Sequence, residues 1–140
     1  MLFQLTYASR TAGILKPNDL QEIIQSSSRN NLRLGVTGAL CLNNGIFLQK
    51  LEGDRLAINH LYHHILKDSR HKEPAILDFS QIVSRQCGKW SMGLITSTQE
   101  NRDMFLKYST TQEFDPYMMS PETLRAFFSE FIQGSVRWLS

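Results

Sequence analysis

Two polar side chains stand at positions where the pattern of the chain calls for apolar ones. Tyr7 and Gln49 alternate with large apolar residues in the strand-like segments 2–7 and 46–51, so both point toward the predicted core. A buried polar group without a hydrogen-bond partner costs about 1–3 kcal/mol, so the phenol and the carboxamide both need partners. Two such groups directed at one space predict a bound molecule between them and the rest of the core.

A third polar group joins them from a predicted helix. Apolar residues after Pro17 repeat at helical spacing, and Asn31, which follows Asn30, continues their stripe. A phenol and amides supply hydrogen-bond donors and acceptors but no charge and no nucleophile. This set suits a flat heterocycle with C=O and N–H edges, such as an isoalloxazine or a nucleobase. The residue types alone leave a second interpretation open, in which Tyr7 is an ordinary strand tyrosine and Gln49 an edge residue.

The elements that position these residues follow the order β-α-β-β-α-β, with one further strand. Helices are expected to begin at Pro17 and after Asp54, a suitable N-cap, and Asn-Asn-Gly at 43–45 predicts a hairpin turn. This order is typical of a ferredoxin-like α+β fold, in which two helices cover one face of a mixed five-stranded sheet. The position of the fifth strand in the sheet stays open. The predicted strands cover residues 2–7, 35–42, 46–52, 75–83 and 92–96.

The chain changes character after residue 96, which predicts a domain over 1–96 and a C-terminal helical extension over 97–140. Short helices are expected at 100–108 and from Ser120 onward, and the second carries an apolar stripe rich in phenylalanine. This stripe must be buried either on the bare face of the sheet or on another subunit. Because exposed apolar stripes tend to be interfaces, a homo-oligomer is expected.

Composition excludes several classes of protein. The chain has 140 residues, 41% of them hydrophobic, and a net charge of +2 without a clustered basic face, so nucleic-acid binding is not expected. No apolar run approaches the length of a membrane span, and the N-terminus lacks the pattern of a signal peptide. Cys41 and Cys87 are interpreted as reduced thiols. The expected protein is soluble and cytoplasmic.

Seven short motifs make a more specific interpretation possible. They are LTYAS at 5–9, RNN at 29–31, GVTG at 35–38, FLQ at 47–49, LEG at 51–53, DSRH at 68–71 and WSM at 90–92. In this order and spacing the chain resembles a BLUF domain, the flavin-binding blue-light sensor module, of the short, stand-alone PixD-like type. The resemblance runs from Met1 to about Thr96.

The resemblance implies a photoactive switch. Tyr7 matches the redox-active tyrosine and Gln49 the switching glutamine, while Trp90 and Met92 match a fifth-strand pair linked to signalling. In this family light transfers an electron and a proton from the tyrosine, and the glutamine changes its hydrogen bonds. The absorption of the flavin then shifts slightly to the red. Similar proteins often carry Phe where this chain has Cys87, a departure that concerns the packing of this loop.

The resemblance also implies how the cofactor is held, which is FAD, with FMN as an alternative. Asn31 matches the residue that bonds the C4=O/N3–H edge of the flavin, and Asn30 lies near the ring. Ile23 and Ile65 match aliphatic residues that flank the ring. The matches at the ribityl-phosphate portion are Asp68, Arg70 and His71, with His64 where many members have Arg.

The implied function is that of a photoreceptor, not an enzyme, whose output passes to a separate protein partner or through self-association. A flavin-dependent enzyme and a ferredoxin-like module that binds a small molecule or RNA remain as alternatives. The spacing of His60, His63 and His64 could place two imidazoles on one metal, but no third ligand is identifiable. We therefore interpret them as a solvated helix face and expect no metal.

Overall fold

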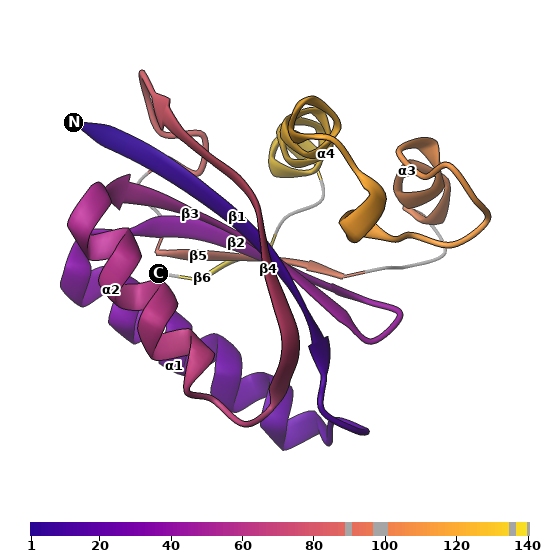
Figure 1. Ribbon diagram of the computed structural model, residues 1–140, viewed down its shortest axis with the longest axis horizontal. Helices are drawn as coiled ribbons and strands as arrows, with labels where there is room; N and C mark the ends of the chain where they lie inside the picture. Colours follow the sequence, from indigo (N-terminus) through magenta and orange to yellow (C-terminus); the bar gives the residue numbers. More distant parts are fainter. Residues whose placement is uncertain (89–90, 97–100, 135–136, 140) are drawn as a thin grey trace.

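The computed structural model describes residues 1–88, 91–96, 101–134 and 137–139. It contains one mixed sheet with strand order β4-β1-β3-β2-β5-β6, and helices lie on both of its faces (Figure 1). The strands are β1 Leu2–Thr11, β2 Thr37–Asn43, β3 Ile46–Asp54, β4 His71–Ile82, β5 Met92–Thr96 and β6 Arg137–Leu139. The helices are α1 Pro17–Leu34, α2 Arg55–Leu66, α3 Arg102–Lys107 and α4 Pro121–Gly134, with a 3-10 turn at Pro116–Met118.

The sheet is built around β1 and β3, which pair antiparallel so that Tyr7 lies directly opposite Gln49. The predicted hairpin joins β2 to β3, where Asn44 and Gly45 adopt positive φ angles of 56° and 70°. The backbones of β2 and β3 approach closely at Gly38. A Cβ atom there would lie 2.4 Å from the carbonyl oxygen of Lys50, so the position requires glycine. Strand β5 lies parallel to β2 on the side away from β3, the placement that the sequence left open.

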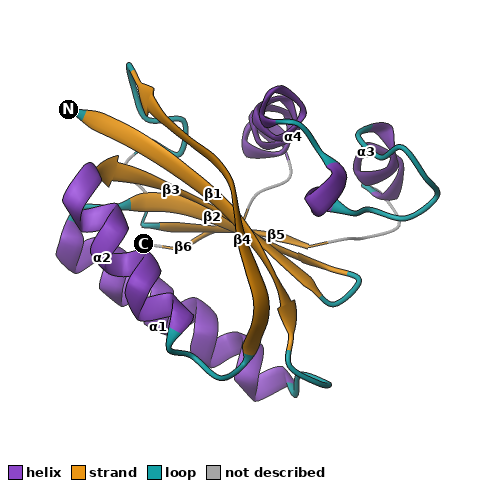
Figure 2. Ribbon diagram, viewed as in Figure 1, coloured by secondary structure: helices purple, strands orange, loops and turns teal. Residues whose placement is uncertain are grey.

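Helices α1 and α2 cover one face of the sheet, as expected for this α+β fold (Figure 2). Asp54 caps α2, and its carboxylate accepts a hydrogen bond from the backbone N–H of Leu56. The buried side of α1 carries Ile23, Ile24 and Asn31, so the amide continues the apolar stripe as predicted. These two helices and the sheet enclose the space into which Tyr7 and Gln49 point.

The opposite face of the sheet is covered by α3 and α4 (Figure 1). The phenylalanine-rich stripe of α4 packs there, within the same chain, against Ala8, Leu48 and Cys41. Of the two expected locations for this stripe, the observed one is the face of the sheet that α1 and α2 leave bare. The stripe is buried within the chain, so it gives no reason to expect a homo-oligomer. The polar residues Gln4 and Thr6 of β1 are buried as well.

Several strands differ in extent from the prediction: β1 runs to Thr11 and β2 begins at Thr37. Strand β4 begins at His71 and not at residue 75, because the polar residues Lys72 and His71 pair with Arg10 and Thr11 of β1 at a solvent-exposed end of the sheet. No hydrophobic alternation marks such an end. The sheet also gains β6, which pairs antiparallel with β5 and makes a sixth strand. No helix in the described part of the chain is long and apolar enough to cross a membrane.

Candidate functional site

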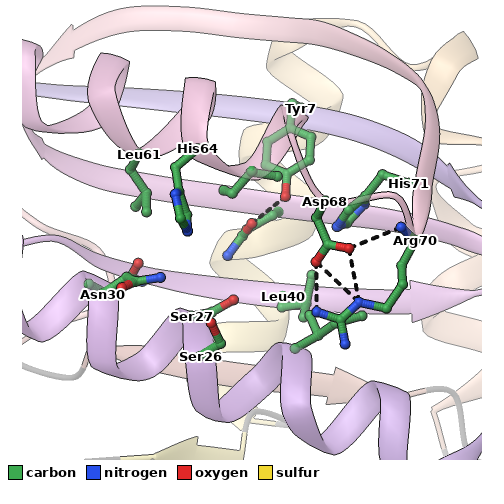
Figure 3. A pocket seen from close by; sticks show the side chains of 14 residues that line it. Tyr7, Ser26, Ser27, Asn30, Leu40, Leu61, His64, Asp68, Arg70 and His71 are labelled. Carbon is green, nitrogen blue, oxygen red and sulfur yellow. Dashed lines mark hydrogen bonds and ion pairs between the residues drawn. The ribbon is translucent and has the colours of Figure 1, made fainter.

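A cavity opens between α1, α2 and the sheet. Figure 3 shows side chains from both helices and from the strands converging on it. Its lining residues are Tyr7, Ile23, Ser26, Ser27, Asn30, Asn31, Leu40, Gln49, Leu61, His64, Ile65, Asp68, Arg70 and His71.

Tyr7 and Gln49 meet at the sheet side of this cavity. The hydroxyl of Tyr7 donates to Oε1 of Gln49 over 2.5 Å, and both side chains are almost completely buried. Burial also raises the pKa of Tyr7 well above its usual range, because a phenolate would lose its hydration there. The phenol therefore stays protonated at neutral pH and acts as the donor in this bond.

The remaining side of the Gln49 amide faces β5. Its Nε2 lies 4.0 Å from the Met92 sulfur, which is fully buried in the same apolar cluster as Phe47 and Leu40. One amide thus contacts the tyrosine on β1 through its oxygen and β5 through its nitrogen. Trp90, the other predicted member of the switch, lies outside the described residues.

Asn31 presents an unpaired oxygen to the cavity region. Its Nδ2 donates to the backbone carbonyl of Ser91 over 2.6 Å, and the Ser28 and Ser91 hydroxyls lie 2.8 Å apart. Its Oδ1 is buried and has no hydrogen-bond partner among the described residues. A buried unpaired amide oxygen beside a cavity is the arrangement that a ligand N–H would satisfy. Asn30 lines the same wall.

The walls of the cavity are apolar on facing sides. Ile23 of α1 and Ile65 of α2 line it, and Leu40 and Leu61 add to them. Aliphatic walls with a polar edge suit a flat heteroaromatic ring, so the residues present fit the isoalloxazine that the sequence implies. Neither Leu40 nor Leu61 was predicted as a site residue, although both stand on the apolar side of their elements.

The mouth of the cavity carries an ion pair that holds Arg70 in place. Its guanidinium lies 2.7 Å from the carboxylate of Asp68 and 3.4 Å from that of Glu22 on α1. Hydrogen bonds from Arg70 hold the pKa of Asp68 below its usual range, so the pair stays charged. Burial lowers the pKa of His71, whose Nδ1 lies 2.8 Å from the Ser9 hydroxyl. A cation and a neutral imidazole therefore both line this part of the cavity.

Other candidate groups lie away from this chemistry. All three histidines of α2 are exposed; His64 also lines the cavity, whereas His60 and His63 do not. The described residues contain no group of three or more His, Cys, Asp or Glu side chains that could hold a metal ion. Cys87 packs into the apolar cluster under α4, where burial raises the pKa of its thiol.

Known proteins share both the sequence and the fold. Residues 2–93 match the family described as BLUF, sensors of blue-light using FAD. A photoactivated adenylate cyclase subunit beta from Euglena longa is 34% identical over 100 residues, which are 71% of this chain and 11% of that protein. The chain thus spans about a tenth of the length of this relative, so the match concerns a module and carries no cyclase activity to this chain.

Two solved structures resemble nearly the whole chain. The photo-activated state of BlsA has a TM-score of 0.88 at 25% identity and covers 100% of this chain and 99% of BlsA. The dark-state structure of BlrB, a BLUF protein, has a TM-score of 0.81 at 31% identity and covers 94% and 96% of the two chains. The ferredoxin-like arrangement with C-terminal helices is therefore shared with these proteins.

Proposed function

The chain belongs to the BLUF family of flavin-binding blue-light sensors, and on this premise we propose that Tyr7 and Gln49 form its light-operated switch. Within that family the 140 residues are a sensor module and not an enzyme domain. One observation supports the proposal above all: the 2.5 Å bond from Tyr7 to Gln49 borders a cavity in which Asn31 Oδ1 has no partner among the described residues.

The lining of the cavity supports the proposal that the chain binds FAD. Ile23 and Ile65 hold the ring between the two helices, and Asn31 bonds its polar edge while Asn30 lies beside it. Of the residues at the mouth, the cationic Arg70 is fixed by the Asp68 carboxylate, and it is placed to meet the ribityl-phosphate portion with His71 and His64. FMN would use the same contacts, because they concern the ring and the first phosphate.

The switch uses the donor and acceptor properties of the two side chains. When bound, a photoexcited flavin supplies a strong one-electron oxidant. Tyr7 gives up an electron and, because an oxidised phenol is strongly acidic, its proton passes along the short bond to Gln49 Oε1. After the electron and the proton return, the amide retains a changed set of hydrogen bonds, since it is donor and acceptor at once. Its altered contact with Met92 would pass the change to β5.

The output would then leave through β5 and the extension over 97–140, which follows the flavin-binding domain over 1–96. We still predict that the signal passes to a separate downstream protein, and that the chain forms a homo-oligomer. A cytoplasmic location suits such a partner.

The proposal is tested by colour. Purified protein reconstituted with FAD is expected to be yellow, and blue light should cause a small red shift that reverses in the dark. Absorbance spectra recorded before illumination, during it and through recovery provide the measurement. Protein that takes up neither FAD nor FMN would contradict the proposal, and a flavoprotein that turns over a substrate without any red shift would favour the enzyme.

Asn31→Ala is expected to weaken flavin binding by about ten- to a hundredfold, because a buried hydrogen bond to the ring edge is lost. Titration of the apoprotein with FAD, followed by the quenching of flavin fluorescence, measures the dissociation constant. Ser27→Ala serves as the matched control, since Ser27 lines the same cavity from the same helix. Equal loss of affinity in both variants would show that Asn31 has no specific contact with the ring.

A further inference from the structure

The carboxylate of Glu52 is completely buried on the face of β3 opposite Gln49. It accepts hydrogen bonds from the Thr37 hydroxyl at 3.0 Å and from the backbone N–H groups of Gln86 at 2.6 Å and Cys87 at 3.0 Å. Both carboxylate oxygens are therefore engaged, and two of the three donors belong to the segment between β4 and β5. We call this segment, residues 85–87, the β5 approach.

Further polar groups fix the β5 approach to the same strand. The Lys50 ammonium lies 3.7 Å from the Glu52 carboxylate and also donates to the side-chain oxygen of Gln86. Arg85 donates to the Thr37 hydroxyl at 2.8 Å, to the Glu52 carbonyl at 3.1 Å and to the Gly35 carbonyl at 2.9 Å. These contacts tie the β5 approach to β2, β3 and the end of α1.

The network occupies a low-dielectric environment, which makes it sensitive to the loss of any member. Burial lowers the pKa of Lys50, and the neighbouring Glu52 carboxylate opposes that shift. The Lys50 side chain is 5% exposed and that of Glu52 is 0% exposed, so each charge depends on the other and on its hydrogen bonds. Such groups favour one arrangement of the backbone they hold.

The β5 approach matters because of where β5 lies. Strand β5 pairs with β2 and β6 and makes no ladder with β3, so the position of Met92 beside Gln49 is not set by direct pairing of their strands. Strand β2 lies between them and pairs with both. The chain before β5 has further supports, which include the bond from Asn31 to the Ser91 carbonyl, the contact of the Ser28 and Ser91 hydroxyls, and the attachment of the β5 approach to Glu52.

We propose that Glu52 is a positioning residue for the switch, which holds the β5 approach so that Met92 rests against the Gln49 amide. The inference rests on the proposed photoreceptor function and assigns a regulatory role to the face of β3 that the cavity does not touch. If light displaces β5, the two backbone bonds to Glu52 loosen, and their re-formation favours return to the dark arrangement.

Glu52→Gln tests this role in the flavin-loaded protein. The Gln86 and Cys87 N–H groups bond different oxygens of the carboxylate, and the carboxamide keeps only one of these acceptors, because its NH₂ group is a donor. We expect an unchanged initial red shift and a dark recovery that is about three- to tenfold slower, because part of the drive toward the dark arrangement is lost. Glu113→Gln, at an exposed carboxylate of the tail, is the matched control and should recover at the wild-type rate.

A second variant and a direct measurement keep the test decisive if Glu52→Gln folds poorly. Arg85→Gln removes donors from a partly exposed side chain and should slow recovery in the same direction. In the wild type, hydrogen exchange of the Gln86 and Cys87 amides should be faster under blue light than in the dark. Recovery within about 1.5-fold of wild type in both variants, or equal exchange in light and dark, would overturn the role of Glu52. A wild type without any light response would instead contradict the photoreceptor function itself.

Discussion

Tyr7→Phe is expected to abolish the light-induced red shift while the protein still binds flavin. The substitution removes only the hydroxyl, so the apolar contacts of the ring with Leu51 and Tyr62 remain. What is lost is the donor of the 2.5 Å bond to Gln49 and, with it, both the accessible electron and the proton that follows it. A hydrogen bond between buried partners has no solvent substitute, so the effect should be close to complete.

Absorbance difference spectra of the FAD-loaded variant provide the measurement. Tyr62→Phe is a closely matched control, because this second buried tyrosine packs with its ring centroid 5.3 Å from that of Tyr7. Gln49 Oε1 receives its hydrogen bond from Tyr7, so the Tyr62 variant should keep a wild-type red shift. A full red shift in Tyr7→Phe would rule out the switch, and loss of the shift in both variants would point to general disturbance of the core.

Phe127→Ala is expected to lower the free energy of unfolding by about 3–5 kcal/mol, the range for large aromatic residues in a packed core. Phe127 is fully buried at the centre of the cluster under α4. Total stabilities of small proteins are about 5–15 kcal/mol, so this loss is a large fraction of the whole. Five rings surround it at centroid distances of 4.6–5.8 Å, those of Phe105, Tyr108, Phe114, Phe128 and Phe131.

Urea denaturation followed by circular dichroism measures this loss. Phe79→Ala is the control of equal chemistry, since Phe79 is 46% exposed on β4 and its truncation should cost only about 1 kcal/mol. If the two variants lose similar stability, the phenylalanine cluster is not the core of the extension. Two separate transitions in the wild type would likewise contradict joint folding of the sheet and α4.

Much of the fold could be predicted because local signals agree with it. The cap at Asp54, the turn at 43–45 and the stripe of α1 through Asn31 each follow from chemistry within a few residues. The neighbour of β5 could not be predicted, because its parallel pairing with β2 joins segments about fifty residues apart with no turn between them. Which surface receives α4 was open for a similar reason, since an apolar stripe does not specify its partner.

The candidate site divides in the same way. Alternation placed Tyr7 and Gln49 on inward-facing positions, and the structure makes them direct partners across two strands. The groups at the mouth came only from the family resemblance, because nothing in a polar loop shows that Asp68 will hold Arg70. Leu40 was not predicted as a wall residue. The sequence does not distinguish an apolar strand residue that lines a cavity from one that packs in a solid core.

Strand β3 has consequences for tuning such a sensor, because its side chains alternate between two separate environments. Gln49 lines the cavity and Leu51 packs with Tyr7 on the same side, whereas Lys50 and Glu52 form the ionic network on the opposite side. Neighbouring side chains on β3 therefore contact different parts of the protein. On the proposed function, we expect substitutions at Gln49 to change the absorption of the flavin, and substitutions at Lys50 or Glu52 to change mainly the duration of the response.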